Sequence, residues 1–255
     1  MKAVDIVEKY LINAQERVDN LHIEGLKIIQ NEKFFRYGTD AVLLAWMAGE
    51  RAKPNFKIAD LGTGSGIIPI LLANNGAKQI HGLEIQEYVA DMAKRSVALN
   101  RLEDEVKIVV GDIKNPPELF IPGSYDIVVS NPPYMNESEG FKSPVREVAI
   151  ARHEILCSMG DVSKTAARLL KDKSRFYLVH KPHRIVDIFC AMREHGIEPK
   201  QMIKVRPHEG KEPNMILIEG VKGGNPGIKL GEEIVVYNQD GTYTEEILKI
   251  YKKVV

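Results

Sequence analysis

Asn131, Pro132, Pro133 and Tyr134 combine an amide, a rigid backbone and an aromatic ring directly after the hydrophobic run at residues 125–130. Neither proline can donate a hydrogen bond to a sheet, so a β-strand must end before them. In open α/β sheets, ligands bind just beyond the carboxyl ends of the strands. The amide oxygen and a proline carbonyl can each accept a hydrogen bond from one NH2 group, and the ring can stack on a flat group. The four residues predict a site for an amine on a planar ring or for a side-chain amide, unless they form only a strand-ending turn.

A glycine cluster at Gly62, Gly64 and Gly66 lies between an expected strand at residues 57–61 and an expected helix that runs to residue 73. Glycine lets the backbone approach a ligand where a Cβ atom would clash. The spacing is Gly-x-Gly-x-Gly, which differs from the Gly-x-Gly-x-x-Gly sequence that binds a dinucleotide pyrophosphate. The loop therefore predicts a small-molecule site of another kind.

Three carboxylates occupy the ends of consecutive expected strands. Glu84 ends the second strand, 18 residues after Gly66, where a carboxylate can accept both ribose hydroxyls of an adenosine. Asp112 follows the third strand and can accept the adenine amino group, while the Ile113 N–H reaches a ring nitrogen. Asp60 opens the glycine turn and can balance a cation such as the ammonium of an amino acid. Together with the glycine loop and residues 131–134, these strand-end residues indicate a ligand site rather than ordinary turns.

These motifs resemble those of class I S-adenosylmethionine-dependent amino-methyltransferases, at residues 60–66, Glu84, Asp112 and residues 131–134. The resemblance implies a Rossmann-like fold, S-adenosylmethionine as cofactor, S-adenosylhomocysteine as product, and catalytic roles for residues 131–134. The cofactor contacts that it implies come from Tyr37, Thr39, Asp40, Asp60, Gly62, Thr63, Gly64, Gly66, Glu84, Ile85, Asp112, Ile113 and Asn131.

Three further stretches, residues 35–45, 151–154 and 236–244, resemble bacterial enzymes that methylate N6 of an adenine in the anticodon loop of valine tRNA. The similarity extends over roughly residues 17–250, and the helix expected at residues 3–16 departs from it. It implies that the partner is RNA, most simply tRNA. The expected RNA contacts are Tyr134, Lys142, Arg146, Arg152, Lys181 and Arg184.

The expected reaction follows from the chemistry of the adenine N6 amine, whose lone pair is delocalised into the ring. If Asn131 and the Pro132 carbonyl each accept one N6–H, they draw the nitrogen toward a tetrahedral geometry and free its lone pair to attack the methyl group. No general base is required, because the N6 proton becomes acidic once the methyl group is attached. Residues 135–155 are expected to form a lid over the substrate, with Tyr134 stacked on the extruded base.

The same amine-binding motif fits other reactions. Enzymes that methylate N5 of a glutamine in a translation release factor share it, but they usually carry a larger helical domain, and fewer than 60 residues precede the motif that begins at Asp60. Methylation of guanine N2 in ribosomal RNA is another alternative. A nicotinamide-dependent oxidoreductase could use residues 62–66 and Glu84, but the dinucleotide spacing is missing and residues 131–134 would have no role.

Bulk charge indicates no particular partner, since Lys plus Arg and Asp plus Glu number 35 each. The distribution is uneven, because residues 141–211 hold 15 Lys or Arg against 8 Asp or Glu. A basic region of this kind can face phosphate groups. Cys157 and Cys190 occur in no metal-ligand or paired spacing, so we expect neither a metal site nor a disulfide.

No apolar run approaches the ~20 residues that a membrane span needs. Asp5 also comes too early for a signal peptide. We therefore expect a cytoplasmic protein that has no membrane partner and is a monomer or a weak dimer.

Strands and helices alternate from residue 57 onward, and this order positions the functional groups. We expect strands at residues 57–61, 80–85, 106–110, 125–131, 176–180, 201–205 and 215–220, and helices from the glycine loop to residue 73 and at residues 87–99, 162–170 and 185–195. The order predicts an α/β fold with a doubly wound, mostly parallel sheet. The last two strands have no helix between them, so they predict an antiparallel C-terminal hairpin at one edge.

Residues 51–255 would then form the methyltransferase domain. The preceding residues 1–50 are expected to pack on it as a helix at 3–16, a hairpin at 21–31 and a helix at 41–49, within one folding unit. Thr39 or Asp40 is expected to cap the last of these helices.

Overall fold

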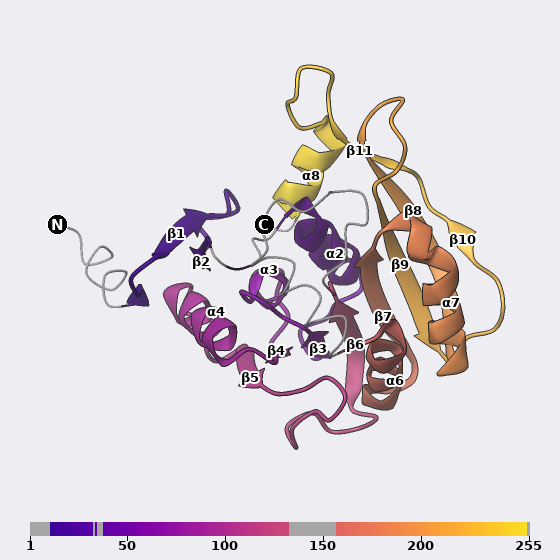
Figure 1. Ribbon diagram of the computed structural model, residues 1–255, viewed down its shortest axis with the longest axis horizontal. Helices are drawn as coiled ribbons and strands as arrows, with labels where there is room; N and C mark the ends of the chain where they lie inside the picture. Colours follow the sequence, from indigo (N-terminus) through magenta and orange to yellow (C-terminus); the bar gives the residue numbers. More distant parts are fainter. Residues whose placement is uncertain (1–10, 33, 35–37, 133–156, 254–255) are drawn as a thin grey trace.

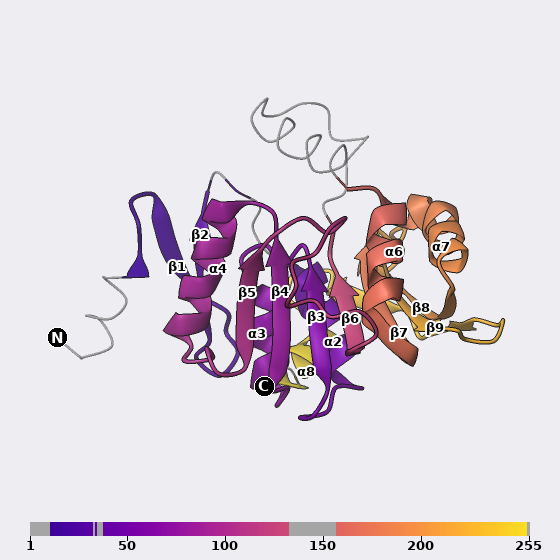
Figure 2. The same ribbon diagram turned by 90° about the horizontal axis from the view of Figure 1, so that it is seen from below.

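A large mixed sheet is covered by helices on both faces, and a small two-stranded hairpin lies at the edge of the molecule where the chain begins (Figures 1 and 2). The computed structural model describes residues 11–32, 34, 38–132 and 157–253. Along these residues the strands are β1 (Glu16–Asn20), β2 (Lys27–Asn31), β3 (Lys57–Leu61), β4 (Gln79–Glu84), β5 (Val106–Val110), β6 (Tyr125–Ser130), β7 (Leu170–His180), β8 (Ile197–His208), β9 (Met215–Lys222), β10 (Lys229–Leu230) and β11 (Ile234–Tyr237). The helices are α2 (Thr39–Gly49), α3 (Ile67–Asn74), α4 (Glu87–Leu99), α6 (Met159–Leu169), the 3-10 helix η1 (Pro182–Arg184), α7 (Ile185–Glu194) and α8 (Glu245–Lys253).

The large sheet has the order β10-β8-β9-β7-β6-β3-β4-β5 in the described residues, with β11 also paired to β8. Strands β5, β4, β3, β6 and β7 are all parallel, whereas β9 runs antiparallel between β7 and β8. Each parallel step is bridged by a connection that carries a helix or a long loop. The expected doubly wound sheet with an antiparallel C-terminal hairpin is therefore confirmed.

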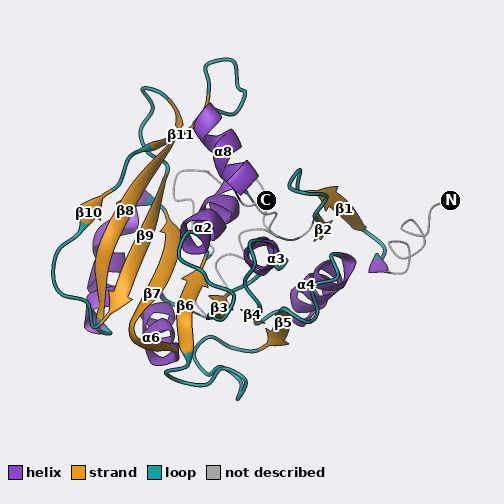
Figure 3. Cartoon of the chain, turned by 180° about the vertical axis from the view of Figure 1, so that it is seen from behind, coloured by secondary structure: helices purple, strands orange, loops and turns teal. Residues whose placement is uncertain are grey.

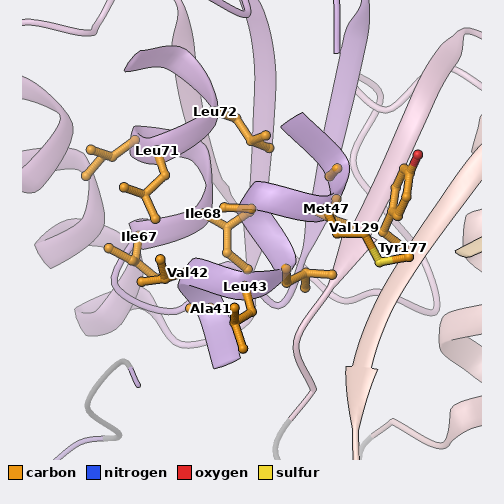
Figure 4. Close-up of a cluster of buried hydrophobic side chains, with 14 of the residues drawn as sticks. Ala41, Val42, Leu43, Met47, Ile67, Ile68, Leu71, Leu72, Val129 and Tyr177 are labelled. Carbon is orange, nitrogen blue, oxygen red and sulfur yellow. The ribbon is translucent and has the colours of Figure 1, made fainter. Parts of the chain in front are cut away.

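Both faces of the parallel strands are buried, which explains why their sequences read as continuous hydrophobic runs. Ile58 of β3 belongs to a buried cluster with residues of α2, α3, α4 and α8, whereas its neighbour Ala59 belongs to a second cluster with residues of α6 and α7. Figure 4 shows Met47 of α2 beside Val129 of β6 and Tyr177 of β7, within a buried cluster that also contains side chains of α3. Figure 3 gives the opposite view, in which α8 lies next to α2. The central strands thus lie in a three-layer sandwich.

The N-terminal hairpin is fixed to α4 rather than to the large sheet. The Ile29 N–H donates to the Ser96 hydroxyl over 3.0 Å, and the Lys27 N–H donates to the Asn100 side chain over 2.9 Å. Arg95 of α4 binds both oxygens of the Glu16 carboxylate at 2.6 and 2.8 Å. A bidentate pair of this kind fixes both position and orientation.

The structure corrects the N-terminal expectations. The helix expected at residues 3–16 lies largely outside the described residues, and within them residues 12–15 are not helical and β1 begins at Glu16. The hairpin starts with residues 16–20, not 21–23. Helix α2 begins after Gly38 and has no side-chain cap, so the cap by Thr39 or Asp40 is wrong. The charged residues of β1 hid a strand that is stabilised by α4.

At the C-terminal end, β10, β11 and α8 were not predicted. Strands β10 and β11 pair parallel with β8, beyond the expected hairpin. No helix among the described residues is long and apolar enough to cross a membrane.

Candidate functional site

The expected functional groups meet at the carboxyl edge of the parallel strands. Asp60 of β3 pairs in register with Gly82 of β4 on one side and Val129 of β6 on the other. Glu84 therefore ends the neighbouring strand on one side, and Asn131 follows the strand on the other. The Ser130 hydroxyl donates to the Leu61 carbonyl over 2.8 Å, which holds the ends of β6 and β3 together.

The glycine loop turns sharply in a conformation that other residues rarely adopt. Gly62, Gly64 and Gly66 have φ angles of 77°, 55° and 83°, all in the left-handed region. A Cβ at Gly66 would lie 3.3 Å from the Cβ of Ala93 in α4, whereas one at Gly64 would meet nothing within 4 Å. The first part of the loop is therefore open toward a ligand, and its last glycine is needed for packing.

Gly82 is a supporting residue that the sequence did not reveal. A Cβ there would lie 2.8 Å from the Thr63 hydroxyl oxygen and 2.7 Å from Ile108 Cδ1. Its lack of a side chain makes room for Thr63 beneath the loop. The N–H groups of Gly62 and Thr63 both donate to the Leu83 carbonyl over 2.9 Å, so the loop is anchored to β4.

Asp60 is fully buried, and neither of its carboxylate oxygens has a hydrogen-bond partner among the described residues. Burial raises the pKa of Asp60 to about 7, and the charge of Glu84 contributes to the increase. The nearby Thr63 hydroxyl lowers the pKa in part, although it makes no hydrogen bond of normal geometry. A buried carboxylate without partners is costly. A cation with N–H donors would remove this cost.

Glu84 is buried beside the loop and already accepts two backbone hydrogen bonds. One oxygen accepts from the Gly64 N–H and the other from the Gln86 N–H, both over 3.0 Å. These bonds fix the plane of the carboxylate. Each carboxylate oxygen can accept more than one hydrogen bond, so capacity for two hydroxyl groups remains. Ile85, the next residue, is about one-third exposed at this edge.

The segment after β5 is held in place by its own turn and by α6. The Lys114 N–H donates to Asp112 Oδ1 over 2.8 Å, and the Thr165 hydroxyl of α6 donates to the Ile113 carbonyl over 2.7 Å. Both Asp112 and Ile113 are partly exposed. Because Glu84 pairs in register with Val110, this segment follows β5 at the same carboxyl edge of the sheet as Glu84.

Asn131 makes a contact that the sequence did not predict. Its side-chain nitrogen donates to Asp40 Oδ2 over 3.0 Å, although the two residues are 91 positions apart. An ionised carboxylate only accepts hydrogen bonds, so the amide nitrogen must face Asp40. The amide oxygen is consequently directed away from Asp40. Asp40 itself is buried in the first turn of α2.

The remaining expected residues divide into two groups. Lys181 follows β7 and lines the same pocket as Asp40, whereas Arg184 lies farther along, in η1, and forms an ion pair with Asp187 at 2.9 Å. Thr39 lies beside the Tyr237 phenol. The residues that lie outside the described part of the chain are Tyr37, Pro133, Tyr134, Lys142, Arg146 and Arg152, together with the whole of the expected lid at 135–155.

Solved structures confirm the expected fold. An Agrobacterium tumefaciens protein described as a predicted O-methyltransferase superposes with a TM-score of 0.67 at 18% identity, over 85% of this chain and 97% of that protein. A ribosomal protein L11 methylase from Lactobacillus delbrueckii subsp. bulgaricus gives a TM-score of 0.55 at 19% identity, over 76% of this chain and 84% of that protein.

Sequence relatives are more similar. A tRNA1(Val) (adenine(37)-N6)-methyltransferase from Aeromonas hydrophila is 28% identical over 84% of this chain and 88% of the relative. One of the same name from Porphyromonas gingivalis is 31% identical over 72% of this chain and 73% of the relative. The family model for the methyltransferase small domain matches residues 36–187. This chain therefore belongs to the methyltransferase small domain family.

Proposed function

We propose that this chain transfers a methyl group from S-adenosylmethionine to N6 of an adenine in tRNA, most specifically adenine 37 in the anticodon loop of a valine tRNA. The observation that carries the proposal is the Asn131 amide, which is fixed by Asp40 at the strand end next to the glycine loop. The names of the relatives from Aeromonas hydrophila and Porphyromonas gingivalis support the choice of substrate.

The residues of the loop side fit S-adenosylmethionine. Asp60 would balance the ammonium group, because its two oxygens lack partners in the described part of the chain. Glu84 would accept the ribose hydroxyls, and Asp112 with the Ile113 N–H would recognise the adenine. Gly64 leaves the space through which the backbone meets the ligand. When bound, this cofactor supplies a methyl group on a sulfonium, which is a strong electrophile.

The chain's own contribution to the chemistry is orientation. The Asn131 amide oxygen and the Pro132 carbonyl would each accept one N6–H of the target adenine. These two acceptors draw the nitrogen toward a tetrahedral geometry and stabilise the positive charge that builds on it during attack. Because the amide is held in place by Asp40 before the substrate arrives, little reorganisation is needed at the moment of reaction. The surplus proton leaves N6 after transfer and needs no dedicated base.

An RNA loop suits this site better than a duplex. Extruding a base costs a few kcal/mol in a duplex and least in a single strand. Stacking of the base on Tyr134 would return about 1–3 kcal/mol. The basic residues in the second half of the chain, including Lys181, favour a phosphate-rich partner. A tRNA substrate would place the enzyme in the cytoplasm, as a monomer or a weak dimer.

The test is methyl transfer from labelled S-adenosylmethionine to unmodified tRNA, followed by nucleoside mass spectrometry. We expect N6-methyladenosine in one valine tRNA, and no product with the Asn131→Ala variant. Release factor, ribosomal RNA and duplex DNA serve as parallel substrates. N5-methylglutamine or N2-methylguanosine as the main product would refute the adenine assignment.

A further inference from the structure

A second recess adjoins Asn131 on the side away from the cofactor loop. It is a half-open pocket of about 230 Å³ whose lining includes the start of α2, the end of β7, and the facing ends of β8, β9 and β11. The lining residues are Gly38, Thr39, Asp40, Lys181, Pro207, Asn214, Met215, Val236 and Tyr237. None of them belongs to the glycine loop or to the segment after β5, and only Thr39 and Asp40 are among the expected cofactor contacts, so the pocket borders the proposed cofactor site at the start of α2.

The position of the pocket follows from the strand order. Strand β7 lies next to β6, β9 and β8 come next, and β11 pairs with β8 (Figure 3), so the strands that line the pocket are one to four strands away from β6, the strand that Asn131 follows. Neighbouring strands are about 5 Å apart, which places the farthest of these strands roughly 20 Å from β6. Asp40 links the two sites directly, because it both lines the pocket and binds Asn131.

We infer that this pocket binds the base of a nucleotide next to the target adenine, an inference that rests on the proposed RNA substrate. Cofactor and drug-sized ligands fill pockets of about 300–1,000 Å³, so a smaller volume suits a single base. Met215, Val236 and Pro207 provide apolar surface, and Asn214 and Thr39 provide an amide and a hydroxyl. Apolar walls with a few polar groups are typical of a site that recognises a flat heteroaromatic ring.

Recognition in this pocket would use the edge of the base rather than its face. The Tyr237 ring is stacked on Tyr243 at 5.2 Å between centroids with an interplanar angle of 13°, and His208 lies 5.6 Å away. The Tyr237 ring therefore already makes aromatic contacts within the protein and is less available to stack on a base. Stacking tolerates any base, whereas hydrogen bonds to a base edge discriminate between bases. We therefore expect a preference for one base at a position flanking the target.

The positively charged side chains near the pocket favour an RNA strand that passes its opening. Lys181 lines it, and His183 and Arg184 follow in η1. The buried His180 does not add to this charge near neutral pH, because burial and the charge of Arg184 lower its pKa to about 4. Asp40 is the one acidic residue among those that line the pocket, and it is held by Asn131. The phosphates would run past Lys181, with the base directed inward.

The test uses a blocked pocket and a matched control. Asn214 is exposed and lines the pocket, so Asn214→Trp should obstruct it without disturbing the core. Asn225 is exposed after the end of β9, at the opposite edge of the sheet, and Asn225→Trp is the control. The substrates are anticodon stem-loop RNAs that carry each of the four bases on either side of the target adenine.

With the unmodified protein, we expect kcat/KM to vary about tenfold or more among the bases at one flanking position. Asn214→Trp should reduce this variation to about twofold and raise the KM for the preferred RNA about tenfold. Asn225→Trp should behave like the unmodified protein. An Asn214→Trp variant that keeps the full base preference overturns the inference.

A binding measurement separates this inference from the proposed function. The methyl signal of Met215, followed by NMR while each of the four nucleoside monophosphates is added in the presence of saturating S-adenosylhomocysteine, should shift with at least one of them. The shift should disappear in Asn214→Trp. Absence of any shift refutes the pocket even if tRNA is methylated, whereas a shift without RNA methylation refutes only the proposed substrate.

Discussion

We predict that binding of S-adenosylmethionine is linked to the loss of a proton from Asp60. The carboxyl group is fully buried without hydrogen-bond partners in the described residues, and burial raises its pKa to about 7. An ammonium group beside it would favour the ionised form. Binding below pH 7 must therefore release a proton, and the affinity must fall as the pH falls.

The size of this effect follows from the pKa. With a value of about 7, roughly half of Asp60 is ionised at pH 7 and about 3% at pH 5.5, so the dissociation constant should rise about 15-fold between these values. This window lies below the pKa of an α-amino group, about 7.7–8.0, so the ligand remains a cation throughout. Calorimetry in two buffers that differ in ionisation enthalpy measures the affinity and the released proton together.

Asp60→Asn should remove the pH dependence and weaken binding by about 10- to 100-fold at pH 7, since a hydrogen bond to a charged group contributes about 1.5–3 kcal/mol. The variant should also be more stable without ligand. A raised carboxyl pKa costs nothing below the unfolded pKa of 3.8 and costs most above 7, up to about 4 kcal/mol at 1.36 kcal/mol per pKa unit. Chemical unfolding at pH 8 should reveal this gain, which should vanish near pH 4.

Two results would contradict this account. One is an affinity that stays constant between pH 5.5 and 7, and the other is an equal pH dependence in Asp60→Asn. Glu219→Gln is a suitable control, because Glu219 is also a buried carboxylate but lies on β9 and pairs with Arg175. The control should keep the pH dependence of the unmodified protein.

Other substitutions should separate binding, turnover and stability. Asn131→Ala should lower kcat by about 100-fold or more, measured by steady-state methylation, and leave the dissociation constant of S-adenosylmethionine nearly unchanged. Asp40→Asn should lower kcat by about tenfold in the same assay, since an amide at position 40 can also donate and so no longer fixes which end of Asn131 faces it. Asp112→Ala should weaken cofactor binding in calorimetry. Arg95→Ala should lower the free energy of unfolding by about 3 kcal/mol at pH 7, because it removes the ion pair of the buried Glu16 side chain and leaves it only the hydrogen bonds from Tyr88 and the Asn13 N–H. The hydrogen bonds of Glu16 lower its pKa to about 2 against the opposing effect of burial, so this contribution is present above pH 4.5 and is lost as the pH falls toward 2.

The sequence alone predicted the bounds of elements that are stabilised locally or are buried on both faces of the sheet. Strands β3 and β5 and helix α4 match their expected bounds, because buried parallel strands read as short apolar runs and α4 has a clear apolar stripe. The hairpin strand β1 was misplaced because Glu16–Asn20 holds three charged residues in five, and its stability comes from the contact with Arg95. The local strand propensity of a segment gives no information about a stabilising contact with a residue far away in the sequence.

The C-terminal omissions have different causes. Strand β10 is two exposed residues long and has no detectable pattern. Helix α8 does carry a signal, because Ile247 and Ile250 recur at a spacing of three and are both buried against the core. This spacing is sufficient to predict the helix from the sequence.

The site was predictable wherever it depends on strand ends. Glu84 is the last residue of β4 and Asn131 directly follows β6. Parallel strands place their carboxyl ends at the same edge of the sheet. The contact of Asn131 with Asp40 was not predictable, because it joins the start of a helix to a strand 91 residues later. Gly82 was equally hidden, since its role is to leave space for a side chain from another strand's loop.

Asp60, beside the glycine loop, and Asn131, after β6, should affect different steps of the reaction. The reason is that Asp60 has no hydrogen-bond partner in the described residues, whereas Asn131 is already hydrogen-bonded to Asp40. On the loop side, Asp60 is buried without partners in the described residues, so a bound cation would offset the free-energy cost of that buried carboxylate and strengthen cofactor binding. An interaction that is equally strong with substrate and transition state improves binding and leaves kcat unchanged. On the acceptor side, Asn131 is already oriented by Asp40, and an oriented dipole acts mainly on the charge that develops on N6. Substitutions at Asp60 should therefore change the dissociation constant with little change in kcat at saturating cofactor, and substitutions at Asn131 should do the reverse. A variant at either position that changed both quantities equally would show that the two halves act as one unit.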